Sequence, residues 1–409
     1  MRRVVVTGLG MINSVGHDKE SAFKAMCEGK CGIDTITLFD PEKYSVKIAG
    51  EVKDFDPTTV MDAKEVKKAD RFIQLGLKAA QEAIEDASLP EDINKERFGI
   101  SAASGIGGLP AIEKNSIIIE TRGPRRISPF FIPSALVNML GGFVSIAHGL
   151  KGPNLSSVTA CAAGTHGISE ACKTIMLGGA DAMLVIAAES AITGAGIGGF
   201  AAMKALSTRN DDPQHASRPF DADRDGFIMG EGAGALILEE YENAVKRGAK
   251  IYAEIIGFGE SGDAYHISTP QPESRGAIAA MQDAYEMADK PHIDYINAHG
   301  TSTYYNDVRE AKAIDTVFGD MKPFVSSIKG QIGHTLGAAG AIEAVVSILA
   351  IKNNSLPPVT NYNASEDDME VLNLITEPLS NREVTTALSC NFGFGGTNAA
   401  IIFQEYLSP

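Results

Sequence analysis

The sequence predicts an α/β fold, and this prediction rests on two observations. Short apolar or β-branched segments alternate with stretches such as Ala69–Ala87, whose apolar residues recur at helical spacing. In addition, SSVTACAAGTHGISEA (156–171) and SSIKGQIGHTLGAAGAIEA (326–344) both run from a strand-like part through a small-residue loop into a helix. A duplicated α/β unit would explain this similarity, and so would chance resemblance between two Gly/Ala-rich segments.

Further buried strands are expected in three runs, namely Arg3–Thr7, which ends at Gly8 and Gly10, Ala182–Ala187 and Ala233–Leu238. The charged segment Glu239–Lys250 precedes a new strand at Ile251–Ile256 and is the expected joint of the chain. Because 409 residues exceed the size of one ordinary domain, we predict two packed halves, residues 1–250 and 251–409.

The charge balance and the cysteines argue against several classes of protein. The chain has 36 Lys and Arg against 52 Asp and Glu, and its net charge of -16 disfavours nucleic acid as a partner. The five cysteines are an odd number without metal-ligand spacing, and the N-terminus lacks a signal-like apolar stretch. Reduced thiols, a cytoplasmic location and no metal are therefore expected.

The longest uncharged stretch, Ile127–Leu150, has enough residues to span a bilayer. Its prolines, glycines and polar residues make it too polar and too broken for a membrane span, so no membrane association is expected. We expect instead a buried helix that begins near Pro133, a candidate for a subunit contact.

Cys161 is the cysteine best placed for chemistry. It lies in VTACAAG (158–164), where a strand-like segment passes into a helix. A thiol at a helix N-terminus faces the positive end of the helix dipole and unpaired backbone N–H groups, and both favour the thiolate. An inert buried cysteine would give the same local pattern, and this interpretation is kept for the other four cysteines.

Two histidines occupy similar settings in the second half of the chain. His299 lies in NAHGTST (297–303), and His334 lies in GHTLGAAG (333–340), just before the second of the two similar helices. Both are expected to follow strands and to precede Gly-rich backbone, which would let them approach a shared cleft. Either histidine alone would suit a structural role, but together with Cys161 they favour a catalytic set.

Three other motifs are less informative. SCNFGFGGTN (389–398) is a Gly-rich turn whose N–H groups could approach an oxyanion, although a plain tight turn fits equally well. The N-terminal Gly-Leu-Gly lacks the third glycine of a dinucleotide fingerprint, so no cofactor is expected. Asp221–Gly226 imitates a calcium loop, but its twelfth position is Gly232. We expect a structural polar loop there, with Arg218 and Arg224 paired to carboxylates.

Taken together, six ordered segments resemble the β-ketoacyl-[acyl-carrier-protein] synthases, in particular the elongating type II enzymes, over essentially the full length. The segments are VVVTGLGMINSVG, VTACAAG, RPFDADRDGFIMGEGAGALILE, NAHGTSTYYND, SSIKGQIGHTLGAAGAIEA and NFGFGGTNA. The resemblance implies a thiolase-like fold of two duplicated α/β halves in a layered αβαβα arrangement. It also implies decarboxylative condensation of a malonyl group with a Cys-bound acyl chain in fatty acid elongation.

The resemblance implies a role for each matching residue. Cys161 would accept the acyl group, and His299 and His334 would bind the malonyl thioester carbonyl and stabilise the enolate. Further residues would support catalysis or contact substrate: Lys329 and Glu343 near His334, the backbone N–H groups of Cys161 and Phe394 as an oxyanion hole, Phe394 as a gate, and Ile106, Ser268, Thr301, Thr303 and Phe392 at the substrate. Tyr304-Tyr305 and Ala162-Ala163 depart from common family patterns, which bears on substrate preference.

The resemblance also implies a homodimer and an acidic acyl carrier protein as partner. Lys67 and Lys68 fall where the family presents basic residues to this carrier. They belong to a cluster at helical spacing with Lys64 and Arg71, with Arg125 and Arg126 as further candidates; a solvated helix face would look the same.

Other functions fit less well. A biosynthetic thiolase would be expected to have a second catalytic cysteine where Phe394 stands, and an initiating type III synthase would be expected to use Asn in place of His334. A non-catalytic chain-length subunit would lack Cys161. A cysteine hydrolase remains an alternative on residue types alone.

Overall fold

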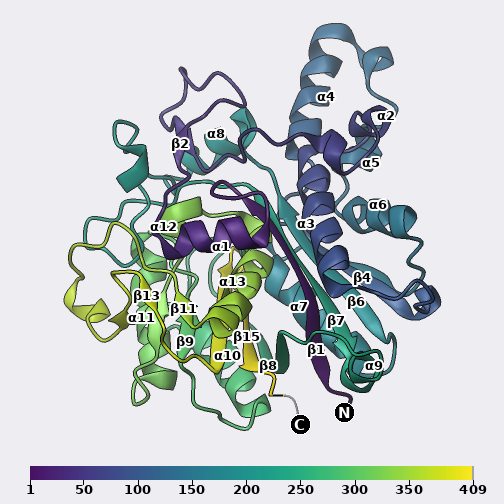
Figure 1. Ribbon diagram of the computed structural model, residues 1–409. Helices are drawn as coiled ribbons and strands as arrows, with labels where there is room; N and C mark the ends of the chain where they lie inside the picture. The colour runs from purple at the N-terminus through teal and green to yellow at the C-terminus, as the bar shows by residue number, and fades with distance from the viewer. Residues whose placement is uncertain (408–409) are drawn as a thin grey trace.

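The computed structural model describes residues 1–407, and its main sheet consists of two parts with the same strand order (Figure 1). The N-terminal part has, in spatial order, β5 (Asn154–Ser157), β4 (Phe98–Ala103), β6 (Ala182–Glu189), β7 (Gly232–Glu240) and β1 (Val4–Asn13). Strands β5, β4 and β6 are parallel, and β7 and β1 pair in antiparallel fashion. Apart from β5, these strands are buried along their whole length, which explains their unbroken apolar runs.

The C-terminal part repeats this arrangement. Its strands are, in spatial order, β10 (Phe324–Ser326), β9 (Tyr295–Asn297), β14 (Thr386–Gly393), β15 (Thr397–Glu405) and β8 (Ala253–Gly262), with β12 (Asn373–Leu374) beyond β10. The parallel and antiparallel pairings recur in the same places, and β1 pairs with β8 to join the parts into one eleven-stranded sheet. The repeated order favours duplication over chance as the source of the two similar segments.

Helices form three layers around the two parts of the sheet (Figure 1). The outer layers are α3 (Arg71–Ala87) on the N-terminal part and α10 (Arg275–Met287) with α11 (Tyr304–Phe318) on the C-terminal part, and the middle layer is α7 (Ala163–Met176) with α13 (Ala339–Asn353). This is the predicted αβαβα order. Helix α13 is buried on all sides because it packs between β7 and β14.

The remaining helices and strands are short or lie at the periphery. They are α1 (Lys19–Cys27), α2 (Ala63–Val66), α4 (Leu109–Arg122), α5 (Phe131–Ala135), α6 (Asn138–His148), α8 (Gly194–Ala202), α9 (Tyr241–Lys246), α12 (Lys329–Ile332), β2 (Asp34–Thr35), β3 (Ile48–Ala49), β11 (Ser355–Leu356) and β13 (Leu379–Ser380).

Helices α7 and α13 approach each other through glycine. A Cβ on Gly164 would lie 2.8 Å from the backbone nitrogen of Ala341, and a Cβ on Gly340 would lie 2.4 Å from the backbone nitrogen of Thr165. Real side chains do not tolerate such contacts with backbone, so the two helices can cross this closely only at glycine.

Strand β1 is longer than predicted. It was expected to end at Gly8 and Gly10, but it continues to Asn13. A Cβ on Gly8 would lie 2.2 Å from the carbonyl oxygen of Ala83, and one on Gly10 would lie 2.0 Å from that of Ala79. These glycines therefore let α3 lie against the strand and do not terminate it.

The prediction of one buried helix near Pro133 is wrong. The stretch Ile127–Leu150 contains the two short helices α5 and α6, and Ile132 and Ile146 are 59% and 82% exposed. A different segment, Leu336–Asn353, is long and apolar enough to cross a membrane, but 89% of it is buried inside the protein as the turn and helix of the middle layer.

Two charged segments differ in outcome. The expected helical row of Lys64, Lys67, Lys68 and Arg71 is wrong, because α2 ends at Val66 and the Arg71 guanidinium turns inward to the buried Glu231 carboxylate at 2.6 Å. The polar loop is confirmed for Arg218, which lies 3.5 Å from Asp221, but Arg224 pairs with Asp307, at 3.9 Å, and not with a carboxylate of the loop.

The helix crossing gives a test of the fold. Gly340→Ala should lower the free energy of unfolding by about 1–3 kcal/mol, because the new methyl group must displace backbone of α7. Gly199→Ala in α8 is the matched control, since a Cβ there meets nothing within 4 Å, and it should leave stability unchanged or raise it slightly. Urea unfolding followed by circular dichroism measures both. Equal stability of the two variants would contradict the close crossing.

Candidate active site

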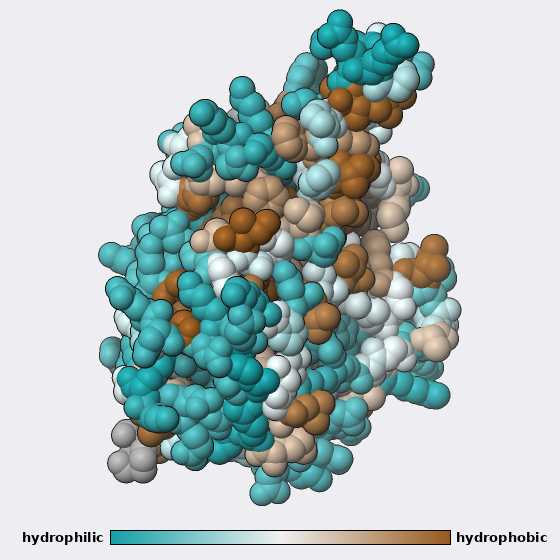
Figure 2. Space-filling view, turned by 90° about the vertical axis from the view of Figure 1, so that its right-hand side faces the viewer, coloured by the Kyte–Doolittle hydropathy of each residue, from teal (hydrophilic) through white to brown (hydrophobic). Residues whose placement is uncertain are grey.

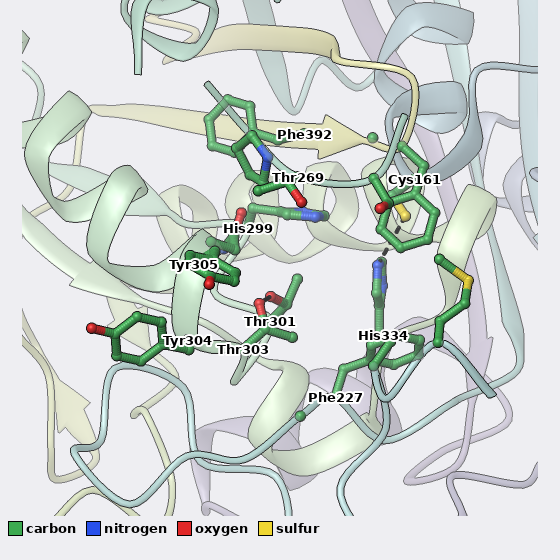
Figure 3. Close-up of a pocket in the computed structure, with 18 of the residues that line it drawn as sticks. Cys161, Phe227, Thr269, His299, Thr301, Thr303, Tyr304, Tyr305, His334 and Phe392 are labelled. Atoms are coloured by element: carbon green, nitrogen blue, oxygen red, sulfur yellow. Dashed lines mark hydrogen bonds between the residues drawn. The ribbon is translucent and has the colours of Figure 1, made fainter. Parts of the chain in front are cut away.

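Residues from both halves line one cavity of about 350 Å³. Its lining includes Cys161, Phe200 and Phe227 from the first half and His299, Thr301, Thr303, His334, Phe392 and Phe394 from the second. Figure 3 shows Cys161 and His334 facing each other, with His299 beside them and the two tyrosines Tyr304 and Tyr305 farther from the sulfur. The three residues singled out from sequence therefore meet at one place.

Cys161 sits in the 3-10 turn Ala160–Ala162 that opens α7. Ala160 has a φ of 50°, a left-handed conformation that costs an alanine on the order of 1–3 kcal/mol. The turn brings the sulfur to the start of the helix and within 3.1 Å of His334 Nε2. The predicted placement of the thiol at a helix start is confirmed.

The backbone fixes the orientation of His334. The N–H group of Leu336 donates to His334 Nδ1 at 3.3 Å, so the proton of the neutral ring lies on Nε2, the atom that faces Cys161. His334 follows the short helix α12 and not a strand, which differs from the prediction. In the resting site it therefore offers an N–H donor to the sulfur.

His299 follows β9 as predicted and is held by a chain of buried polar groups. Its Nδ1 lies 3.1 Å from the amide nitrogen of Asn391, which also donates to Glu343 Oε2 at 2.7 Å. The other carboxylate oxygen of Glu343 accepts from the buried Lys329 ammonium. Lys329 and Glu343 thus form a buried ion pair, which Asn391 connects to His299.

Burial dominates the electrostatics of the site. It lowers the pKa of both histidines well below the ordinary value, and the charge of Lys329 acts in the same direction. Both rings are therefore neutral near pH 7. Burial also raises the pKa of the Glu343 carboxyl, while Lys329 and Asn391 lower it.

The same burial raises the pKa of the Cys161 thiol to about 12. The charge of Lys329 and the backbone N–H groups of Phe394 and Cys161 act in the opposite direction, and the charge of Glu189 reinforces the rise. The N–H groups at the helix start therefore act toward the thiolate, as expected, but burial outweighs them in the resting site. The N–H donors stabilise negative charge as it develops on the sulfur.

Some of the other residues predicted for the site line the cavity, and some do not. Ser268, Thr301, Thr303, Phe392 and Phe394 all line the cavity. Ile106 is not among its lining residues; it lies in the loop after β4, where its N–H group donates to Glu189 at 3.1 Å. Lys67 and Lys68 lie outside the cavity as well, near α2.

Sequence reasoning missed two residues of this site. Asn391 lies inside the Gly-rich motif, but only the glycines and phenylalanines of that motif suggested a function from sequence. Phe227 packs edge-to-face on His334, with ring centroids 5.3 Å apart. Both residues could have been identified by their position in the sequence, because both lie within motifs that match the family.

The three side chains at the sulfur also resemble the ligand set of a metal site. Cys161, His299 and His334 bring their ligand atoms within 4.8 Å of one another, and thiolate and imidazole are ligands that zinc prefers. However, the Leu336 N–H group occupies the Nδ1 lone pair of His334 and places its proton on Nε2, which a metal would need free. This arrangement suits hydrogen-bond donation better than metal binding.

A buried thiol beside two neutral imidazoles, in a layered α/β fold, is a set of groups suited to covalent acyl transfer. Models of the β-ketoacyl synthase N-terminal and C-terminal domains match residues 1–244 and 252–363. The 3-oxoacyl-[acyl-carrier-protein] synthase 2 of Coxiella burnetii is 48% identical and that of Vibrio harveyi 46% identical, each over 99% of both chains. The chain belongs to the β-ketoacyl synthase family.

Solved structures agree with this assignment. A β-ketoacyl synthase from Burkholderia phymatum superposes with a TM-score of 0.92 over all of both chains at 32% identity. A ketosynthase of a type II polyketide synthase, in complex with its acyl-carrier protein and bound to a hexaketide, gives a TM-score of 0.90 at 32% identity, over 99% of this chain and all of that one. The predicted thiolase-like fold, acyltransferase class and condensing function in fatty acid elongation are confirmed.

Proposed function

We propose that Cys161 carries the growing acyl chain and that His299 and His334 act on the malonyl group of an acyl carrier protein. The observation that carries this proposal is the 3.1 Å contact between Cys161 Sγ and the Nε2–H donor of His334. The sulfur attacks the acyl thioester carbonyl, a C–S bond forms, and the carrier thiol leaves with the proton. The backbone N–H groups of Cys161 and Phe394 hold the oxyanion that forms during this step.

Condensation uses the two imidazoles. The malonyl thioester carbonyl accepts hydrogen bonds from them, carbon dioxide leaves, and the electrons of the broken C–C bond form an enolate. The enolate carbon attacks the acyl-enzyme carbonyl, and the Cys161 thiolate departs to give 3-oxoacyl carrier protein. Neutral rings suit this role because they donate hydrogen bonds without protonating the enolate.

Variants separate the two half-reactions. Cys161→Ala should abolish acylation and condensation, whereas Cys161→Gln should keep malonyl decarboxylation, since both histidines remain. His299→Ala or His334→Ala should accumulate acyl-enzyme with condensation reduced at least about 100-fold. Intact-protein and peptide mass spectrometry with acyl carrier proteins of graded chain length measures adduct and product. An adduct on Cys172 or Cys390 would contradict the proposal, as would free acid in place of 3-oxoacyl product.

The same proposal divides the chain into residues 1–250 with the nucleophile and residues 251–409 with the histidines, and it places the enzyme in the cytoplasm. The repeated strand order and the two family matches support this division.

The proposal includes a docking patch for the acidic carrier around Lys67 and Lys68. The Lys68 ammonium lies 5.4 Å from the Phe130 ring centroid, and the turn that carries Arg125 and Arg126 precedes that ring. Because the enzyme carries a net charge of -16, encounter with an acidic protein requires locally positive surface. The Glu65 carboxylate, 2.5 Å from Lys68, reduces the positive charge of the patch.

Charge reversal tests the patch. Lys67→Glu, Lys68→Glu should raise the apparent KM for carrier-bound substrate several-fold and remove its dependence on salt. Activity on a small thioester without the carrier should stay unchanged, and the exposed pair Lys290→Glu, Lys352→Glu serves as control. Equal loss on both substrates would show that these lysines support the fold and not docking.

We further propose a homodimer formed at the free edge of β5. Figure 2 shows brown, apolar groups on the face that carries α4 and α6. Large apolar side chains that are exposed on α4 to α6 and at this edge are Ile112, Ile117, Ile119, Ile132, Leu136, Ile146, Leu155 and Val158. An unpaired edge strand can pair with the same strand of a second copy, and large apolar patches mark interfaces.

Sedimentation velocity measures the dimer directly. The parent should sediment at twice the chain mass of 43.2 kDa. Ile146→Lys, Leu155→Lys should shift it toward one chain, because charge is then buried in the contact. A parent that sediments as a single chain at micromolar concentration would rule the dimer out.

A further inference from the structure

One buried carboxylate outside the proposed catalytic set collects an unusual number of donors. Glu189 ends β6 and is fully buried. Its carboxylate accepts from the backbone N–H groups of Gly105 at 2.6 Å, Ile106 at 3.1 Å, Gly107 at 3.2 Å and Gly337 at 3.0 Å, and from the Ser104 hydroxyl at 2.9 Å. Because all five partners donate, the group fits an ionised carboxylate and not a protonated one.

The donors come from two separate segments that meet beside Cys161. Four belong to the loop 104–107 after β4, and the fifth, Gly337, lies three residues after His334 in the turn that opens α13. These segments touch, since a Cβ on Gly337 would lie 2.0 Å from the nitrogen of Gly105. Glu189 therefore joins the end of β6, the 104–107 loop and the His334 turn.

The Glu189 carboxylate also lies close to the turn that holds the thiol, because a Cβ on Gly105 would lie 2.7 Å from Glu189 Oε2 and 3.5 Å from the carbonyl oxygen of Ala160, the residue before Cys161. Burial raises the pKa of Glu189 itself, and its hydrogen bonds oppose that rise. Its charge raises the pKa of the Cys161 thiol, whereas Lys329 lowers it, and the neutral His299 and His334 complete the titratable surroundings of the sulfur.

We propose that Glu189 is a positioning residue that fixes the His334 turn and the 104–107 loop against the start of α7, and that its negative charge restrains the reactivity of the free thiol. This inference rests on the proposed role of Cys161 as acyl carrier. The two effects of Glu189 can be separated. The arrangement of the turn and the loop depends on the five hydrogen bonds that its carboxylate accepts, whereas the reactivity of the thiol depends on its charge.

Glu189→Gln separates these effects. The amide removes the charge. Its NH₂ group faces backbone N–H donors and cannot accept from them, so the hydrogen bonds to one of the two carboxylate oxygens are lost. We expect the pH profile of Cys161 alkylation by iodoacetamide to shift to lower pH by about one unit. We also expect condensation turnover to fall at least about tenfold. Partial unfolding would also relieve the burial of the thiol and slow turnover, so Glu189→Gln is compared with the parent only if its urea unfolding midpoint matches that of the parent.

Two further variants complete the test. Glu189→Asp keeps the charge but shortens the reach, so the alkylation profile should stay in place while turnover falls. Glu51→Gln is the matched control, because Glu51 is similarly buried and accepts from the Thr37 and Leu38 N–H groups, not from the 104–107 loop or the His334 turn; it should change neither readout. Parent-like turnover and profile in folded Glu189→Gln, or the same changes in Glu51→Gln, would overturn the proposal.

Failure of the catalytic proposal would look different. Acyl mapping to another cysteine in the parent enzyme would remove the role of Cys161 as carrier. The alkylation profile of Cys161 would still report whether Glu189 controls this thiol.

Discussion

The site depends on the close crossing of α7 and α13. Gly164 and Gly340 allow backbone to meet backbone there, so the first turns of two buried helices lie side by side. One turn carries Cys161, and the other follows His334 directly. The 3.1 Å contact between their side chains joins residues 173 positions apart and follows from this crossing. Backbone packing, more than side-chain contacts, therefore places the thiol and the imidazole side by side.

Near this crossing, buried charged side chains are compensated in two ways, by an opposite charge and by hydrogen bonds. Lys329 and Glu343 form a pair that supports His299 through Asn391, and Glu189 is balanced by hydrogen bonds alone. Breaking a buried pair is costly, so these groups make the site rigid as well as polar. The cavity thus holds two neutral imidazoles and a protonated thiol, with buried charged groups around them.

Much of this was predictable because the chemistry lies in local motifs. The helix start at Cys161, the two histidines and the Arg218–Asp221 pair of the polar loop all lie in motifs whose residues are close in sequence. What failed depended on packing: the glycines of β1 resembled a strand end but admit α3, and Arg71 resembled a surface charge but pairs with Glu231, 160 residues away. Glu189 carried no sequence signal, because four of its five donors are backbone N–H groups.

The two halves repeat the same turn before their middle helices, down to a left-handed residue at the same place: Ala160 has a φ of 50° and Leu336 a φ of 48°. Cys161 in the first turn corresponds to Gly337 in the second. No side chain fits at Gly337, because Gly105 nitrogen occupies the position that a Cβ would need. Duplication therefore doubled the scaffold without doubling the thiol, since the second turn has no side chain where the first has Cys161.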